Sequence, residues 1–254
     1  MAVDVAPRVR LNFVGALFGA GVLAQIAYPL VTGTARNALT VVIVLTVAAA
    51  SLCHAALTRG GRAVATLAVV TVCGGFAVEV LGVHTGVPFG RYAYATSLGP
   101  CAFGVPVVIA FAWTMLAWPA ALVAHRLVST FAARVLLGAW ALAAWDLFLD
   151  PQMVAAGHWR WVDPAVHLPG VPAVPISDYL GWFAVSVLMS VALQWVLLGT
   201  DGDDRWPLAF YLWTWASSTL ALAVFLGLGA AAVWGFLAMG TVAVPLVRSL
   251  ARSR

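Results

Sequence analysis

Apolar segments of about 20 residues recur along the whole chain, and each is long enough to cross a bilayer as a helix. Of the 254 residues, 63% are hydrophobic and only 9% are charged, a composition that excludes a soluble fold of this size. The expected spans cover residues 11–31, 38–57, 63–84, 103–125, 131–150, 179–199, 207–227 and 231–249. The sequence therefore predicts an all-α fold, a polytopic membrane bundle of about eight transmembrane helices that forms a single integral membrane domain over residues 1–254.

The arginines indicate the orientation of these spans. Ten of the thirteen lie in the two termini and in the second, fourth and sixth loops, and the other three are Arg36, Arg91 and Arg160. Because loops on the cytoplasmic side carry the excess of positive charge, we expect both termini in the cytoplasm and a multi-pass protein of the cell membrane. The positive charge is spread over short loops, so nucleic-acid binding is not expected.

Four acidic residues lie in or at the ends of the apolar segments: Glu79, Asp146, Asp150 and Asp178. An ionised carboxylate that faces lipid is costly, so these side chains should face the bundle interior and have a function. In the expected topology all four lie toward the non-cytoplasmic end. The sequence therefore predicts one site that contains them.

Asp146 and Asp150, in the segment WDLFLDP, are four residues apart, so one face of a helix carries both carboxylates. Two close carboxylates repel each other, and such a pair can act as a proton donor and its conjugate base. The same spacing can bind a divalent metal that holds a diphosphate. That chemistry needs further acidic and basic residues that are not evident, so we expect no metal and no cofactor. Glu79, within the third span, is another candidate proton donor.

Each of these acids also has a structural interpretation. Asp150 precedes Pro151 at an expected helix end, where it can accept local hydrogen bonds. Asp146 can form an interhelical hydrogen bond. Asp178 in PISDYLGW fits the N-cap of the sixth helix, which is its leading interpretation.

Aromatic side chains flank the acids in the sequence. Some must belong to the interfacial belt, yet aromatic faces also stabilise cations, so acids and tryptophans together would suit a reaction through a carbocation. For the histidines near the same end, hydrogen-bonding roles are favoured over metal binding, and these are His84, His158 and His167. The candidate substrate-binding residues are His84, Phe89, Arg91, Tyr92, Tyr94, Trp145, Trp159, Trp161, Asp178 and Trp182.

Four ordered segments, GVHTGVPFGRYAYATSLGP, GVPVVIAFAW, WDLFLDPQMVAAGHWRW and GVPAVPISDYLGW, resemble the membrane-bound carotenoid biosynthesis family of the carotenoid 1,2-hydratase and bisanhydrobacterioruberin hydratase type. The likeness covers roughly residues 74–183, and it departs from the expected pattern at Asp178, where asparagine is expected. It implies a cofactor-independent addition of water to the terminal isoprenoid double bond of an acyclic-ended carotenoid of the lycopene, γ-carotene or C50 type. The substrate would enter from the bilayer, among membrane lipid, and association with other carotenoid biosynthesis enzymes would fit this role.

For such a reaction the candidate acid is Asp146 or Glu79, with Asp150 orienting water and Tyr92, Trp145, Trp159 and Trp161 around the cation. We expect Glu79→Gln, Asp146→Asn and Asp150→Asn each to abolish hydration in a folded protein. A prenyltransferase and a carotenoid cyclase would use related cation chemistry and remain alternatives. A proton-coupled transporter would use buried acids as a relay, although no inverted repeat is found.

Overall fold

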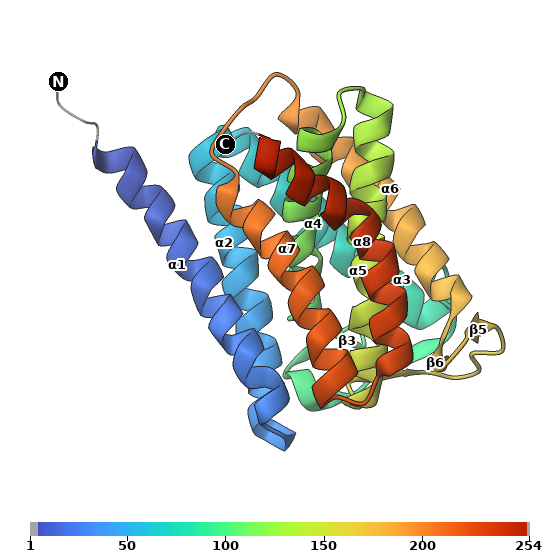
Figure 1. Cartoon of the computed structure of the whole chain (residues 1–254). Coiled ribbons are helices and arrows are strands. Elements are labelled where there is room, and N and C mark those ends of the chain that lie inside the picture. The colour runs from blue at the N-terminus through green and yellow to red at the C-terminus, as the bar shows by residue number, and fades with distance from the viewer. Residues whose placement is uncertain (1–4, 253–254) are drawn as a thin grey trace.

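The bundle has two structurally different ends (Figure 1). The computed structural model describes residues 5–252. The start of the first helix and the end of the last helix lie at one end, here called the terminal end, and short strands close the other, here called the strand end. The helices are α1 (Val5–Ala27), α2 (Gly33–Leu67), α3 (Gly74–Thr85), α4 (Ile109–Leu127), α5 (Phe131–Ala155), α6 (Ile176–Leu197), α7 (Arg205–Leu220) and α8 (Gly229–Arg252).

Seven helical segments of the described chain are long and apolar enough to cross a membrane. The third of them, Gly61–Thr85, includes the end of α2, a π-helical stretch at Ala68–Cys73 and α3. The predicted membrane bundle is confirmed, and so is the division of the last apolar run, where Gly227 adopts a positive φ of 69° between α7 and α8. Which end faces the cytoplasm stays a prediction.

The remaining helix, α4, is the central element of the bundle. It contacts α2, α3, α5, α6, α7 and α8, and its side chains are buried almost continuously from Ile109 to Ala124. A helix that is apolar on every side can be buried on every side by its neighbours. Its central position lets α4 present side chains to cavities on two sides.

Two predicted helix boundaries are wrong. The span expected at 103–125 begins later, because its first residues form a hairpin of β2 (Cys101–Ala102) and β3 (Val105–Pro106), and α4 starts at Ile109. The span expected to end at Asp150 continues through Pro151 to Ala155. A proline removes one backbone donor from a helix, and here α5 continues because it packs against α6 and against two strands, β4 (Trp159–Trp161) and β6 (Val171–Pro175).

Short antiparallel strand pairs close the strand end. In the first pair, β1 (Tyr92–Tyr94) and β4 (Trp159–Trp161), Tyr92 lies opposite Trp161 and Tyr94 opposite Trp159. A second pair joins β5 (His167–Leu168) and β6 (Val171–Pro175). Side chains alternate between the two faces of a strand, so the four aromatic residues of β1 and β4 lie on one face, toward the helices.

Candidate active site

Acidic and aromatic side chains of the bundle gather in one small cavity beneath the β1–β4 pair, here called the acid chamber. Its volume is about 30 Å³, which is room for water rather than for a large ligand. It is lined by Glu79, Phe89, Tyr92, Tyr94, Ile109, Ala112, Trp113, Leu149, Asp150, Trp159, Trp161, Asp178 and Trp182. The lining combines acids with aromatic rings, as the sequence predicted, and brings together segments that lie far apart in the chain.

Glu79 is held by three hydrogen-bond donors. The Tyr92 hydroxyl donates to Oε2 at 2.5 Å and the Tyr94 hydroxyl to the same oxygen at 2.8 Å, while the Trp113 indole donates to Oε1 at 3.1 Å. The side chain is only 4% exposed. Both oxygens therefore act as acceptors, which is the arrangement that stabilises an ionised carboxylate.

The two tyrosines remain donors because of their surroundings. Burial raises the pKa of Tyr92 far above its ordinary value of 10.0, and the negative charge of Glu79 raises it further. Burial and Glu79 likewise raise the pKa of Tyr94 well above that value. Neither hydroxyl loses its proton near neutral pH, so both can hold Glu79 in place.

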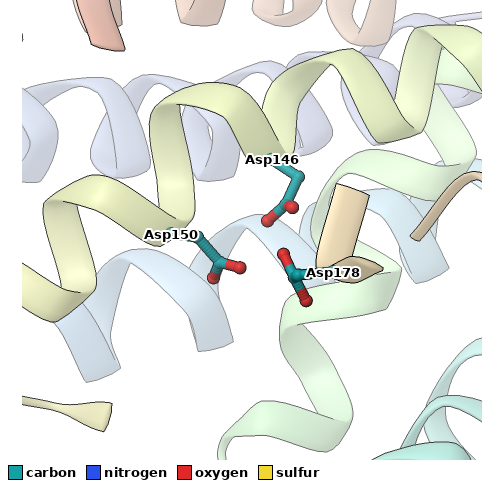
Figure 2. A group of neighbouring side chains, drawn as sticks. All are labelled: Asp146, Asp150 and Asp178. Carbon is teal, nitrogen blue, oxygen red and sulfur yellow. The ribbon is translucent and has the colours of Figure 1, made fainter. Parts of the chain in front are cut away.

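The three aspartates form a separate group. Figure 2 shows their carboxyl groups pointing toward one another, Asp146 and Asp150 from α5 and Asp178 from α6. One ligand atom from each lies within 4.8 Å of the others, and the side chains are 0%, 3% and 1% exposed, respectively. This cluster, here called the aspartate triad, joins the two helices just behind the acid chamber, which Asp150 and Asp178 line.

The triad lacks donors and cations. Neither oxygen of Asp146, nor Oδ2 of Asp150 or Asp178, receives a hydrogen bond in the described part of the chain. The exception is Oδ1 of Asp150, which accepts from the Trp159 indole at 3.1 Å. No arginine or histidine is among the described residues that line the chamber. Three buried carboxyl groups in such a place can coexist when they share protons, which supply the missing donors.

A divalent cation is the other group that the triad could hold. Ca²⁺ and Mg²⁺ bind oxygen ligands at 2.0–2.6 Å, and ligand atoms within 4.8 Å of one another can meet that requirement. The geometry therefore admits either a shared proton or a metal ion. The expectation that no metal is needed stays a prediction, and chelation tests it.

Stacked tryptophans form the wall of the chamber beside the acids. The rings of Trp113 and Trp182 stack with centroids 3.9 Å apart and planes 18° apart, and Trp145 meets Trp182 edge-on at 6.1 Å. Aromatic faces attract cations. A cation formed at the edge of the chamber would therefore meet aromatic rings as well as the charge of Glu79.

Glycines allow the aromatic rings to come this close to the helices. A Cβ atom at Gly75 would lie 2.7 Å from the Trp113 ring, one at Gly82 2.7 Å from the Tyr92 hydroxyl, and one at Gly181 2.8 Å from the Phe89 ring. Real Cβ atoms do not approach other atoms so closely. These three glycines thus fix the position of the aromatic lining.

The structure brings most of the predicted site residues together. The exceptions are His84 and Arg91, which are exposed and lie outside the chamber lining, Asp146, which lies behind it in the triad, and Trp145, which lines a neighbouring cavity. Of the other histidines, His158 shares a hydrogen bond with Ser97 at 2.8 Å and His167 with its neighbouring backbone.

The structural interpretations of two aspartates are wrong. Pro175, not Asp178, is the N-cap residue of α6, and Asp178 lies in the first turn without capping it. Asp150 does not end α5, which continues to Ala155. The sixth helix begins at Ile176, earlier than the expected start at 179, and the fifth helix ends later than expected. Asp178 and Asp150 therefore lie within helices, with their carboxyl groups pointing toward Asp146 (Figure 2).

Trp113 is the main site residue that the sequence analysis did not single out. It donates to Glu79 and stacks on Trp182. A signal was present, because Trp113 ends the segment GVPVVIAFAW, which carried part of the family resemblance. Ile109 and Ala112 of the same segment also line the chamber, but small and aliphatic residues in an apolar helix carry no distinguishing pattern.

Comparisons with known proteins point to one family. Residues 37–243 match the family model described as carotenoid biosynthesis protein. A curated relative, bisanhydrobacterioruberin hydratase of Haloarcula japonica, is 32% identical over 160 residues, which cover 58% of this chain and 47% of the relative. The chain thus spans about half the length of that relative. No solved structure matches the chain.

Proposed function

Because the chain belongs to the carotenoid biosynthesis protein family, we propose that it is a carotenoid hydratase, a hydro-lyase that adds water to a terminal isoprenoid double bond. The observation that carries this proposal is that an anchored carboxylate and an aromatic wall line one chamber together with Asp150 and Asp178 of the aspartate triad. The relative that is named as a hydratase supports the same reaction class. The substrate would be an acyclic-ended carotenoid that enters from the bilayer.

The first step is the transfer of a proton to the alkene. We assign the donor role to Asp150, because it lines the chamber and shares the triad with two further carboxyl groups that can supply its proton. Protonation of the less substituted alkene carbon breaks the π bond and leaves a tertiary cation on the neighbouring carbon. Donation by a positioned acid contributes about 10²–10⁴-fold to a rate.

The cation is stabilised by groups that do not react with it. Glu79 provides a negative charge, and its three hydrogen bonds keep its lone pairs engaged so that it acts through its field. Preorganised charge of this kind is worth far more in a site without bulk water than in solution. This assignment differs from the expectation that the acid is Asp146 or Glu79 and that Asp150 orients water, because it gives the acid role to Asp150 and an electrostatic role to Glu79.

Water completes the reaction. A water molecule in the chamber attacks the cation, a C–O bond forms, and the released proton returns to the carboxylate of Asp150 or Asp178. The product is a tertiary alcohol, and the carboxyl groups regain their initial protonation. The net change is the addition of one water, with no redox partner.

The composition of the lining favours hydration over prenyl transfer. A diphosphate needs cationic partners, and the described residues around the chamber include no arginine or histidine. The bundle would act as a single membrane domain in the cell membrane, with both termini in the cytoplasm, and association with other carotenoid biosynthesis enzymes would supply its substrate.

Pigment analysis in a producing host tests the proposal. The chain is expressed in cells that accumulate lycopene, or a C50 relative with unsaturated ends, beside the Asp150→Asn variant and the matched control Asp163→Asn, which changes an exposed loop acid. We expect a gain of one water per reacted end with the unmodified chain and the control, and none with Asp150→Asn. Unchanged pigments with membrane-inserted protein would overturn the proposal, and a product of unchanged mass would indicate a cyclase.

A further inference from the structure

A second cavity lies beside the acid chamber and shares part of its wall. It has a volume of about 110 Å³. Its apolar lining comes mainly from α2, α4 and α5, and includes Ile43, Val44, Met115, Phe148 and Met153. We call it the apolar cavity.

The two cavities meet at four residues. Ile109, Ala112, Leu149 and Trp159 line both the apolar cavity and the acid chamber. Ile109 and Ala112 come from α4, which lies between the two spaces, and Leu149 precedes the proposed donor Asp150 on α5. A group that rests in the apolar cavity against these four residues is therefore next to the acids.

The two cavities differ in size, and the difference indicates which ligand each can hold. The chamber has room for water, whereas the apolar cavity is nearly four times larger, at about 110 against 30 Å³. A cavity of this size is nevertheless below the 300–1,000 Å³ that surrounds a whole drug-sized ligand. It can take the end of a long hydrocarbon while the rest of the molecule stays outside.

Most of the lining of the apolar cavity is buried. The partly exposed lining residues are Leu149 and Gln152 of α5, together with a larger group where α1 meets α7, which consists of Gln25, Ser217, Ser218 and the adjoining Ala221. We therefore infer that the cavity opens between α1 and α7. Gln25 accepts a hydrogen bond from Trp213 of α7 at 2.7 Å, so the two helices touch beside this opening. Both helices face the lipid with exposed apolar residues, among them Leu23 and Leu220.

We propose that the apolar cavity is the binding site for the terminal isoprenoid units of a linear polyene, which enters from the bilayer between α1 and α7. The reacting double bond then lies at the shared wall formed by Ile109, Ala112, Leu149 and Trp159, with water and the acids on its far side. This inference rests on the proposed function for the identity of the ligand. It assigns hydrocarbon to the larger cavity and water to the smaller one.

Filling the opening tests the inference. Ser218→Phe places a ring in the opening of the apolar cavity, and Ser218→Leu is a smaller change for use if the first variant does not fold. Ala216→Phe is the matched control, because Ala216 is on the same helix, is exposed and does not line the cavity. Detergent-solubilised protein is incubated with lycopene, separated from free pigment, and the bound polyene is measured by its visible absorption.

The expected result is that Ser218→Phe weakens lycopene binding by about tenfold or more, equivalent to at least 1.4 kcal/mol, while Ala216→Phe binds like the unmodified protein. Hydration of lycopene should fall in parallel with its binding, because the proposal has the reacting end reach the shared wall only through the apolar cavity. Equal lycopene binding in all folded variants would overturn the inference.

The binding measurement separates the two proposals. If the unmodified protein binds lycopene, Ser218→Phe does not, and no hydration occurs in any sample, the binding site stands and the proposed function fails. If hydration occurs and is unaffected by both Ser218 variants, the proposed function stands and the binding site is placed wrongly.

Discussion

The two ends of the bundle differ in whether a buried acid has a cationic partner. At the terminal end Arg59, which is 1% exposed, contacts Asp204 with its Nη2 atom 2.8 Å from Oδ2. His54 beside it accepts from the Trp118 indole at 3.0 Å through Nδ1 and donates through Nε2 to the backbone oxygen of Asp203 at 3.0 Å. This bonding pattern fixes the neutral form of the histidine.

At the strand end the aspartate triad has no such partners. The three carboxyl groups lie within reach of one another, and no arginine or histidine is among the described residues of the chamber beside them. A buried acid that a cation neutralises can tie a loop to a helix, whereas buried acids without a cation are candidates for proton transfer. The contrast therefore supports a structural role for the Arg59–Asp204 pair and the proposed catalytic role for the triad.

The largest expected effect is the loss of the proton donor. Asp150→Asn should lower the rate of hydration by about 10²–10⁴-fold, because the amide cannot donate a proton to an alkene. The melting temperature should be unchanged or higher, since one buried acid is removed. The assay is product formation by purified protein with lycopene, beside Asp163→Asn. A variant that retains most of the activity would show that another group is the donor.

Breaking the ion pair at the terminal end should lower stability and leave activity unchanged. Arg59→Met leaves Asp204 without its cation, and we expect the free energy of unfolding to fall by about 2–4 kcal/mol, below the full value for a buried pair because Asp204 is partly exposed. Activity per folded molecule should be unchanged. Thermal unfolding in detergent measures the first effect and a single-turnover assay the second. A stable but inactive variant would contradict this structural role.

Removing one donor from Glu79 should have a moderate effect. Tyr94→Phe deletes a hydrogen bond to a charged group, worth about 1.5–3 kcal/mol, and should slow hydration by roughly tenfold or more. Tyr211→Phe is the control, since this buried hydroxyl donates to the Ala141 backbone away from the chamber. If both substitutions slow the reaction equally, the effect comes from packing and not from Glu79.

A smaller effect is expected from pH. Burial lowers the pKa of His158 below its ordinary value of 6.5, so the folded protein binds a proton there less readily than the unfolded chain does. The stability from neutral His158 is therefore complete above that value and is lost as the pH falls through the lowered pKa. His158→Gln should flatten the decline of the melting temperature between about pH 7 and pH 5. If the melting temperature of the variant declines as steeply as that of the unmodified protein, groups other than His158 cause the decline.

The smallest expected effect is that of metal removal. If the triad shares protons, a chelator should leave the hydration rate unchanged, and added Mg²⁺ should not raise it. Purified protein treated with a chelator and then dialysed provides the sample. Loss of activity that Mg²⁺ restores would show that the triad binds a metal ion.

The fold was largely predictable because its main determinant, the length of the apolar segments, can be read directly from the sequence. The break between the last two spans, expected at 207–227 and 231–249, agrees with the structure, where Gly227 has a positive φ. The helix starting at Ile109 and the continuation through Pro151 were not predicted, because both depend on tertiary contacts that override local preference.

The site was predictable in its residue types and less so in its geometry. The cost of burying charge singled out Glu79 and the three aspartates, although N-capping was the leading interpretation of Asp178, and the aromatic residues were found because they flank these acids in the sequence. The separation of Glu79 from the triad depends on the donors Tyr92, Tyr94 and Trp113, which meet only in the folded bundle. The apolar cavity has no sequence signal, because its lining is typical of any buried helix.

Infrared spectroscopy of the carboxyl groups tests the central contrast most directly. The carbonyl band of a protonated carboxylic acid is recorded at neutral pH for the unmodified protein and for the Asp146→Asn/Asp150→Asn/Asp178→Asn variant, with exchange into D₂O to confirm the assignment. We predict a carboxylic acid band in the unmodified protein that disappears in the variant, while Asp204→Asn leaves it in place. A spectrum in which every carboxyl group is ionised would contradict proton sharing in the triad.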